Sequence, residues 1–279
     1  MSNTDTQAVI RLEGVEKSYG KHQVLKGVTM QVNKGDIYGL VGKNGAGKTT
    51  IFKMILGLSE FKTGSVSIAG STTKKELFTN RGKIGFFVGS NFYNYLTGKA
   101  NLEYYARAKG IPRSEMKDEV NRVLELVGLQ DVKQPVKGYS LGMKQRLGIG
   151  NAILGNPEIL ILDEPTNGLD PQGIADIRHM VRRFRDEYGM TVIVSSHILG
   201  ELENTADRFG IVHNGVIAKE ITQEDLSLKR PEIELSVSMD DLEKARQILS
   251  QNGINILKEG KEKVTLEDYY FELIGGEAD

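Results

Sequence analysis

The segment from residue 42 to residue 49 constrains the fold of this chain more than any other feature. It reads Gly-Lys-Asn-Gly-Ala-Gly-Lys-Thr and satisfies the pattern G-x-x-x-x-G-K-[ST]. A short apolar run, 37–41, precedes it, and apolar residues recur at helical spacing over 51–58. We therefore expect a buried strand, a glycine-rich loop and a helix, in that order, which is how a βαβ unit begins.

The chemistry of this segment predicts that it binds the phosphates of a nucleoside triphosphate. Glycines let the backbone curl so that successive N–H groups face inward, and the following helix points its positive dipole end at the same place. Lys48 is expected to reach the β- and γ-phosphates, and the Thr49 hydroxyl to coordinate Mg²⁺. An ordinary glycine-rich turn is the alternative, which the strand–loop–helix context disfavours. The residues predicted to contact the nucleotide here are Gly42, Lys43, Asn44, Gly45, Ala46, Gly47, Lys48, Thr49 and Thr50.

Two acidic residues, Asp163 and Glu164, follow a second apolar run at 159–162. The carboxyl ends of buried parallel strands are where open α/β sheets bind ligands. Asp163 is suited to hold Mg²⁺, and Glu164 to polarise an attacking water. Such a pair is often only a strand end, but here the glycine-rich loop precedes it, with Lys48 lying 115 positions before Asp163.

The remaining patterns predict an α/β fold with a mostly parallel sheet. A third apolar run, 191–194, follows a helical pattern that Asp170 and Pro171 are suited to begin. Near the N-terminus, the stretches 9–12 and 28–32 indicate antiparallel strands. Asn214-Gly215 is typical of a hairpin turn.

Two regions depart from the strand–helix alternation. We interpret residues of about 90–150 as a helical subdomain inserted into the α/β core. From residue 221 to 279 we expect a small α+β appendage, with alternating residues over 233–237, a helical pattern over 242–249 and a final helix over 267–274. The main domain is then predicted to span residues 8–220.

Composition excludes several classes of protein. The 279 residues carry 36 Lys and Arg against 37 Asp and Glu, so no bulk charge favours nucleic acid or an anionic membrane. There is no cysteine, which excludes disulfides, thiolate metal sites and a cysteine nucleophile. No signal-peptide pattern is present, and no apolar run approaches the roughly 20 residues that cross a bilayer. We expect a soluble cytoplasmic protein whose membrane role, if any, comes through a partner.

Three further segments specify the family. Residues 139–146 read Tyr-Ser-Leu-Gly-Met-Lys-Gln-Arg, residues 165–170 read Pro-Thr-Asn-Gly-Leu-Asp, and residues 195–197 read Ser-Ser-His. With the two motifs above, the sequence resembles the ATP-binding cassette (ABC) ATPases of ABC transporters over roughly residues 8–220.

The resemblance implies roles for five further residues. Tyr19 would stack on adenine, Ser140 and Gly142 would form the signature loop, Asp170 would lie in the D-loop, and His197 would donate to the γ-phosphate. Each has a structural alternative: a core tyrosine, a helix cap for Ser140 and for Asp170, and an ordinary strand-end histidine.

Three departures from the family pattern are visible. The signature loop has Leu141 in place of a glycine and Met143 in place of a glutamine, a variant that resembles the bacitracin-resistance and lantibiotic-immunity branch of exporters. The glutamine expected near Gly89 is missing, and Ser90 and Asn91 are the nearest residues with side-chain oxygens. Lys43 stands where the family often has proline.

An aromatic segment, residues 92–98, follows the position of the missing glutamine. The resemblance implies that a groove near here receives a helix of a membrane permease, and exposed aromatics suit such an interface. Packing beneath the helical subdomain is the alternative, and the sequence leaves both open.

The function that the resemblance implies is that of an exporter's ATPase subunit. Two copies would bind two MgATP head to tail and drive a separate permease, with the chain peripheral on the inner face of the cell membrane and no nucleic-acid partner. Glu164 would be the general base, Lys48 and His197 would act on the γ-phosphate, and Thr49 with Asp163 would hold Mg²⁺. A peptide antibiotic as cargo is suggested only by the signature variant.

Two alternatives remain to be weighed. A soluble cassette acting on ribosomes or DNA is disfavoured, because the chain has one cassette and only 92 positions separate Lys48 from Ser140. A regulatory module with little turnover is conceivable without the glutamine, but Glu164 and His197 argue against it.

Overall fold

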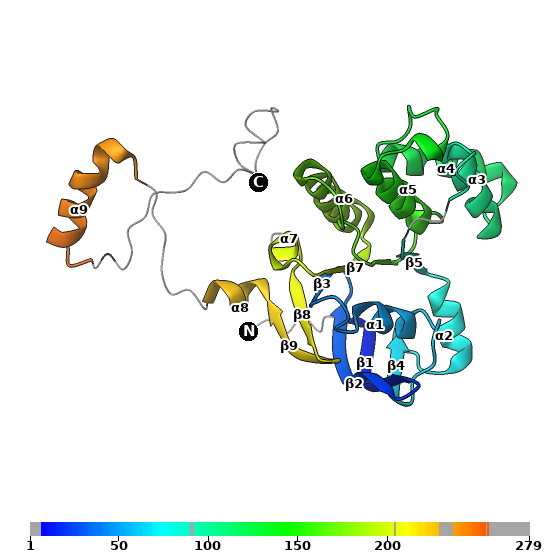
Figure 1. Ribbon diagram of the computed structural model, residues 1–279, viewed down its shortest axis with the longest axis horizontal. Coiled ribbons are helices and arrows are strands. Elements are labelled where there is room, and N and C mark those ends of the chain that lie inside the picture. The colour runs from blue at the N-terminus through cyan, green and yellow to red at the C-terminus, as the bar shows by residue number, and fades with distance from the viewer. Residues whose placement is uncertain (1–6, 90–91, 204, 229–236, 255, 257–279) are drawn as a thin grey trace. The chain divides into compact units, whose positions relative to one another are not determined.

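The computed structural model describes residues 7–89, 92–203, 205–228, 237–254 and 256. The chain divides into two compact units, residues 1–225 and 226–279, and each is described by itself. The first unit contains two β-sheets with helices packed on them (Figure 1).

The smaller sheet is antiparallel and has the strand order β2–β1–β4. Its strands are β1 (Ala8–Tyr19), β2 (His22–Asn33) and β4 (Thr63–Ile68). Ile10 and Leu12 of β1 are fully buried while Arg11 between them is exposed, because successive side chains of a strand point to opposite faces. The predicted antiparallel N-terminal strands are confirmed.

The larger sheet has the order β5–β6–β7–β3–β8–β9 and is parallel except for the pair β8–β9. Its central strands are buried along their whole length, which agrees with a sheet covered on both faces. The hairpin between β8 and β9 turns at Asn214 and Gly215, whose φ values of 49° and 82° are those of a type I′ turn, as the sequence predicted. The strands are β3 (Ile37–Val41), β5 (Ile84–Phe87), β6 (Ile159–Leu162), β7 (Thr191–Ser196), β8 (Arg208–His213) and β9 (Val216–Thr222).

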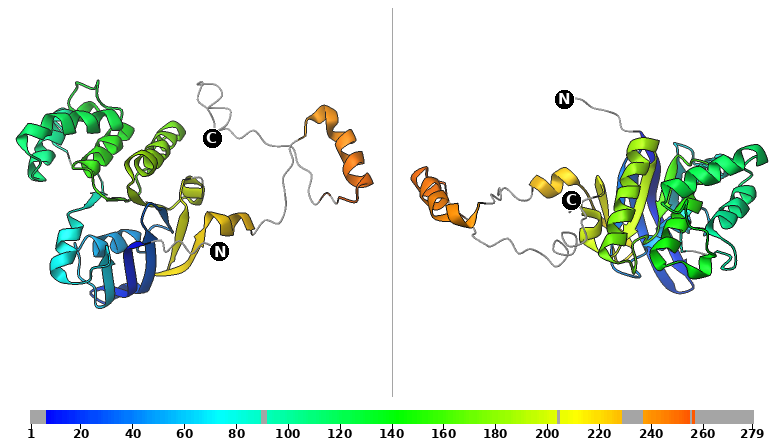
Figure 2. Two further views of the ribbon diagram at one scale, coloured as in Figure 1. Left: turned by 180° about the vertical axis from the view of Figure 1, so that it is seen from behind. Right: turned by 90° about the horizontal axis from the view of Figure 1, so that it is seen from above.

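Helix α1 (Lys48–Ile55) joins the two sheets into one core. Its residues Ile51, Phe52, Met54 and Ile55 are fully buried and belong to a cluster with residues of both sheets. The smaller sheet and α1 lie on one side of the larger sheet, and α6 (Pro171–Tyr188) and α7 (Leu199–Glu203) lie on the other (Figures 1 and 2). Helix α2 (Lys74–Arg81) packs beside β4.

The predicted helical subdomain is present between β5 and β6. It consists of α3 (Gly98–Ala108), α4 (Arg113–Leu126), the short 3₁₀ helix Val136–Gly138 and α5 (Leu141–Ile153). Gly148 of α5 lies so close to Phe87 of β5 that a Cβ at Gly148 would be 2.3 Å from the phenyl ring. The absent side chain therefore lets this helix pack directly on the sheet.

The second unit contains the short 3₁₀ helix Met239–Asp241 and α9 (Leu242–Gln251), which the sequence pattern predicted. Helix α8 (Gln223–Leu228) crosses the boundary between the units. The expected alternation at Ile233 and Leu235 and the expected final helix over 267–274 lie outside the described residues. Within the described part of the chain, no helix combines the length and the apolar composition that a membrane span requires.

Glu119 of α4 is expected to stabilise the helical subdomain in a pH-dependent way. Burial raises the pKa of Glu119, but hydrogen bonds from Arg122 (2.8 Å to each carboxylate oxygen) and from the Gly155 amide (2.7 Å) outweigh burial and hold the pKa below its ordinary 4.5. A lowered pKa in the folded state adds stability that is complete above the ordinary value and is lost as the pH falls through the folded-state value.

Glu119→Gln is therefore expected to lower the free energy of unfolding by about 1–2 kcal/mol at pH 7. The difference from the parent should shrink below pH 4.5, where the parent carboxylate also becomes protonated. Urea unfolding of both proteins at several pH values measures this difference. A difference that does not change with pH would contradict the assignment of the effect to the carboxylate charge.

Candidate active site

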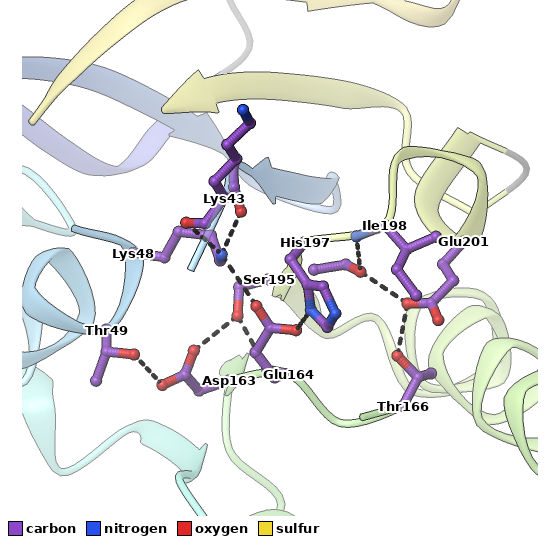
Figure 3. Close-up of polar contacts among 12 residues, drawn as sticks. Lys43, Lys48, Thr49, Asp163, Glu164, Thr166, Ser195, His197, Ile198 and Glu201 are labelled. Carbon is purple, nitrogen blue, oxygen red and sulfur yellow. Dashed lines mark hydrogen bonds and ion pairs between the residues drawn. The ribbon is translucent and has the colours of Figure 1, made fainter. Parts of the chain in front are cut away.

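The candidate site lies where the carboxyl ends of three neighbouring parallel strands meet. Strand β7 lies between β6 and β3, so the segments that follow these strands converge at one edge of the sheet. The glycine-rich loop follows β3, Asp163 and Glu164 follow β6, and His197 follows β7. Figure 3 shows side chains from all three segments pointing toward one another.

The glycine-rich loop delivers Lys48 to the centre of the site. Gly47 precedes α1 with a φ of 116°, and a Cβ there would lie 2.8 Å from the Leu25 side chain, so a glycine is required on both counts. The Lys48 side chain is only 5% exposed. Its Nζ donates to the carbonyl oxygens of Gly42 (2.5 Å) and Lys43 (3.4 Å), within the curl of the loop.

Thr49 and Asp163 are brought together although they lie far apart in the sequence. The Thr49 hydroxyl donates to Asp163 Oδ2 at 2.6 Å, and the Ser195 hydroxyl donates to Asp163 Oδ1 at 2.7 Å. A hydroxyl and a carboxylate are hard oxygen donors of the kind Mg²⁺ takes beside phosphate and water ligands. Among the described residues, no three His, Cys, Asp or Glu side chains gather into a metal site of their own. This pair thus fits a Mg²⁺ ion that is held jointly by protein and nucleotide.

Glu164 contacts both Lys48 and His197. Its Oε1 lies 3.0 Å from Lys48 Nζ and its Oε2 lies 2.6 Å from His197 Nδ1. Burial raises the pKa of Glu164, but the hydrogen bonds from His197 and Lys48 outweigh it and keep the pKa below its ordinary value. The carboxylate is therefore ionised at neutral pH, as a group that accepts a proton must be.

The backbone of Glu164 is held in an uncommon conformation. Its φ is 49°, in the left-handed region that side chains other than glycine rarely adopt. The surrounding structure fixes it there: its amide donates to Ser195 Oγ at 2.9 Å, and its carbonyl oxygen accepts from the Asn167 amide at 3.2 Å. Strained backbone of this kind is frequent where a functional side chain must point in one direction.

The other predicted residues of the loop lie around its rim. Lys43, Asn44 and Gly45 are exposed, and the Lys43 side chain points away from Glu164 in Figure 3. Tyr19, at the end of β1, is 48% exposed, with Lys17 Nζ 4.9 Å from its ring centroid. The alternative of a core tyrosine is therefore wrong, while stacking on adenine stays a prediction.

The signature loop and the D-loop form a second, separate cluster. A pocket of about 430 Å³ is lined by residues of both loops. Ser140 Oγ accepts from the Met143 amide at 3.2 Å and so caps α5, and Asp170 Oδ1 accepts from the Gly173 amide at 2.8 Å and caps α6. The capping interpretation of both residues is confirmed, and a further role toward phosphate stays a prediction. The lining residues are Ser140, Leu141, Gly142, Arg146, Gly168, Leu169, Asp170, Gln172, Gly173, Asp176 and Ile177.

The aromatic segment after β5 is part of an exposed cluster. Tyr95 is 73% exposed, and the ring of Tyr93 packs edge to face with that of Tyr104 on α3 at 5.0 Å. The rings thus pack against α3 and also face outward, while contact with a permease stays a prediction. Ser90 and Asn91 lie outside the described residues, and Gly89 has a φ of 71°.

Sequence reasoning did not single out the side chains that support the reacting groups. Ser195 bonds to Asp163 and to the Glu164 amide, as described above, and Glu201 accepts from Thr166 and Ser196. Ser195 and Ser196 were visible as part of the motif before His197, but nothing in the local pattern marked Glu201. Its partners lie in the segment after β6 and at the end of β7, which only the folded sheet brings together.

Comparison with known proteins identifies the family. The family model for ABC transporters matches residues 25–167. The bacitracin transport ATP-binding protein BcrA of Bacillus licheniformis is 38% identical over 96% of this chain and 98% of its own length. The lantibiotic transport ATP-binding protein SrtF of Streptococcus pyogenes is 40% identical over 76% of this chain and 90% of its own length.

A solved structure supports the same conclusion. A dimeric ATP-binding cassette in a post-hydrolysis state, bound to ADP and phosphate, matches 77% of this chain and 98% of its own with a TM-score of 0.68 and 26% identity. The chain belongs to the ATP-binding proteins of the ABC transporter family. It is an ATPase of the P-loop class, and the predicted fold is confirmed.

Proposed function

We propose that this protein is the ATPase subunit of an ABC exporter and that its cassette, residues 8–220, drives a separate membrane permease. The observation that carries the proposal is the cluster in which Lys48 and His197 both contact Glu164 beside the Thr49–Asp163 pair. That arrangement suits transfer of a γ-phosphoryl group to water. The names of the relatives BcrA and SrtF, which refer to bacitracin and lantibiotic transport, favour peptide antibiotics or other toxic compounds as cargo.

In the proposed reaction, each residue has one task. Lys48 donates to the γ-phosphate and offsets the negative charge that develops on it. Thr49 and Asp163 hold Mg²⁺, which neutralises phosphate charge when it is bound. The ionised Glu164 takes a proton from the attacking water.

His197 orients Glu164 and contacts the γ-phosphate in the same proposal. Its Nδ1 donates to Glu164 Oε2, because that carboxylate is ionised and can only accept. Its Nε2 is then the nitrogen that faces the phosphate.

The second cluster is proposed to complete the site of another copy of the chain. Ser140 begins α5, and a serine-capped helix N-terminus is a favourable place for an anion. In a head-to-tail dimer, Ser140, Gly142 and Asp170 of one copy would lie against the nucleotide on the glycine-rich loop of the other, with Tyr19 against the adenine. The similar cassette solved as a dimer supports this arrangement.

Affinity capture of the Glu164→Gln variant from its native membranes, in detergent with MgATP, tests the exporter proposal. We expect mass spectrometry to find one polytopic membrane protein in near-stoichiometric yield, because a slow variant retains the ATP-bound complex. Capture of the Lys48→Ala variant in the same way is the matched control for ATP-dependent complexes. Recovery of ribosomal proteins or DNA-bound partners, with no membrane protein, would contradict the proposal and favour a soluble cassette.

A further inference from the structure

One carboxylate outside the group of proposed reacting residues joins two loops of the site. Glu201 lies on α7, and its Oε2 alone accepts two hydrogen bonds, from Thr166 Oγ1 at 2.8 Å and from Ser196 Oγ at 2.7 Å (Figure 3). Thr166 is two residues after Glu164, and Ser196 directly precedes His197. A single oxygen thus connects the segment that carries Glu164 with the segment that carries His197. The side chains of these two residues are in contact at 2.6 Å.

The sheet itself does not hold these two segments together at the site. The pairing of β6 with β7 ends at Leu162 and Val194, before either reacting residue is reached. Beyond that pair, the segments are linked by side chains: Ser195 bonds to Asp163 and to the Glu164 amide, and Glu201 bridges Thr166 and Ser196. Of these two links, the Glu201 bridge lies farther along the chain from the end of β6.

Ser196 transmits this restraint to His197. The Ser196 side chain is fully buried, and its Oγ also accepts from the Ile198 amide at 2.9 Å, on the other side of the histidine. Its carbonyl oxygen accepts from the Gly42 amide at 3.3 Å, at the start of the glycine-rich loop. Glu201 therefore acts on a residue that fixes the turn around His197 and borders the phosphate-binding loop.

We propose that Glu201 is a positioning residue for ATP hydrolysis, which holds His197 and Glu164 in the geometry that proton transfer requires. The inference rests on the roles proposed above for Glu164 and His197. A displacement of about 1 Å between reacting groups can cost roughly 100-fold in rate. Since one oxygen of Glu201 accepts both bonds, positioning requires a hydrogen-bond acceptor at the place of this oxygen and not a negative charge.

Steady-state ATP hydrolysis by a set of Glu201 variants tests this proposal. Glu201→Ala is expected to lower kcat by about 10- to 100-fold while the KM for ATP stays within about twofold, because Glu201 restrains the two reacting residues and not the nucleotide. Glu201→Gln keeps a carbonyl oxygen for both bonds and should recover most of the parent kcat. Glu203→Ala, an exposed position on the same helix, is the control that should keep the parent rate.

Two partner variants separate positioning from a general loss of structure. Thr166→Val and Ser196→Ala each remove one of the two bonds, and each should lower kcat in part. Their effects should be far from additive with Glu201→Ala, because all three changes break one network. All rates are expressed per nucleotide-binding site, titrated with a fluorescent ATP analogue, so that loss of folded protein does not count as loss of kcat.

The outcomes are distinct. A parent-like kcat in Glu201→Ala would overturn the proposal, and so would a Glu201→Gln variant as slow as Glu201→Ala. If Glu201→Ala does not fold, parent-like rates in both Thr166→Val and Ser196→Ala would overturn it instead. Glu164→Gln and His197→Ala are measured in parallel: parent-like turnover in those two would refute the proposed roles of Glu164 and His197, whatever the Glu201 variants show.

Discussion

The Glu164→Gln variant is expected to bind ATP with an affinity within about threefold of the parent and to hydrolyse it at least about 100-fold more slowly. Glutamine keeps the size of the side chain and can still bond to His197 or Lys48, so the binding site retains its shape. It cannot take a proton from water, because an amide is not a base at neutral pH. Phosphate release measures the rate, and titration with a fluorescent ATP analogue measures the affinity.

The same variant should accumulate as a dimer in MgATP, since closure is no longer followed by hydrolysis. Size-exclusion chromatography with light scattering detects the change in mass. Glu158→Gln is the matched control, because Glu158 lies just before β6, at the end opposite to Glu164. Its side chain is 65% exposed and forms an ion pair with Lys83 at 2.8 Å. Parent-like turnover in Glu164→Gln would show that another group is the base.

The Lys48→Ala variant is expected to lose most of its affinity for ATP and to show no measurable turnover. Loss of hydrogen bonds from a charged donor costs about 1.5–3 kcal/mol each, so the Kd for ATP should rise by at least about 10-fold. The substitution also removes the cation 3.0 Å from Glu164, which helps keep the pKa of that carboxyl low. The substitution is therefore expected to weaken ATP binding and also to make the ionisation of Glu164 less favourable.

Lys53→Ala is the control for the Lys48 experiment. It removes the same charge from the helix that begins at Lys48, but Lys53 is exposed and lies outside the glycine-rich loop. The Kd for ATP should change by less than about threefold, as expected for an exposed charge in water. Equal losses in the two lysine variants would contradict the assignment of the phosphate contact to the buried side chain.

The local features of the fold were predictable because they depend on neighbouring residues. The glycine-rich loop between a strand and a helix, the cap at Asp170 and the Asn214-Gly215 turn each follow from short-range sterics and hydrogen bonding. The predicted helical subdomain of about 90–150 corresponds to helices within 98–153, so its existence was predicted more accurately than its limits.

The order of the strands could not be derived from the periodicity of the sequence. Nothing in the sequence pattern places β7 between β6 and β3, since parallel neighbours are chosen by packing of the whole sheet. That order is what brings Asp163, 114 positions after Thr49, to 2.6 Å from its hydroxyl. The family resemblance supplied the expectation, and the folded sheet supplies the physical reason.

The class of chemistry was predictable from the sequence, because the phosphate-binding loop, the Asp163-Glu164 pair and the Ser-Ser-His segment carry their chemistry in residue type and local spacing. How these groups are held depends on the tertiary structure. The left-handed backbone of Glu164 and the Glu201 bridge depend on partners from the segment after β6, from β7 and from α7, which are adjacent in space and distant along the chain. Glu201 restrains two other segments, and its distance from them in the sequence is set by the path of the chain and not by its chemistry. Such a residue therefore leaves no local sequence pattern.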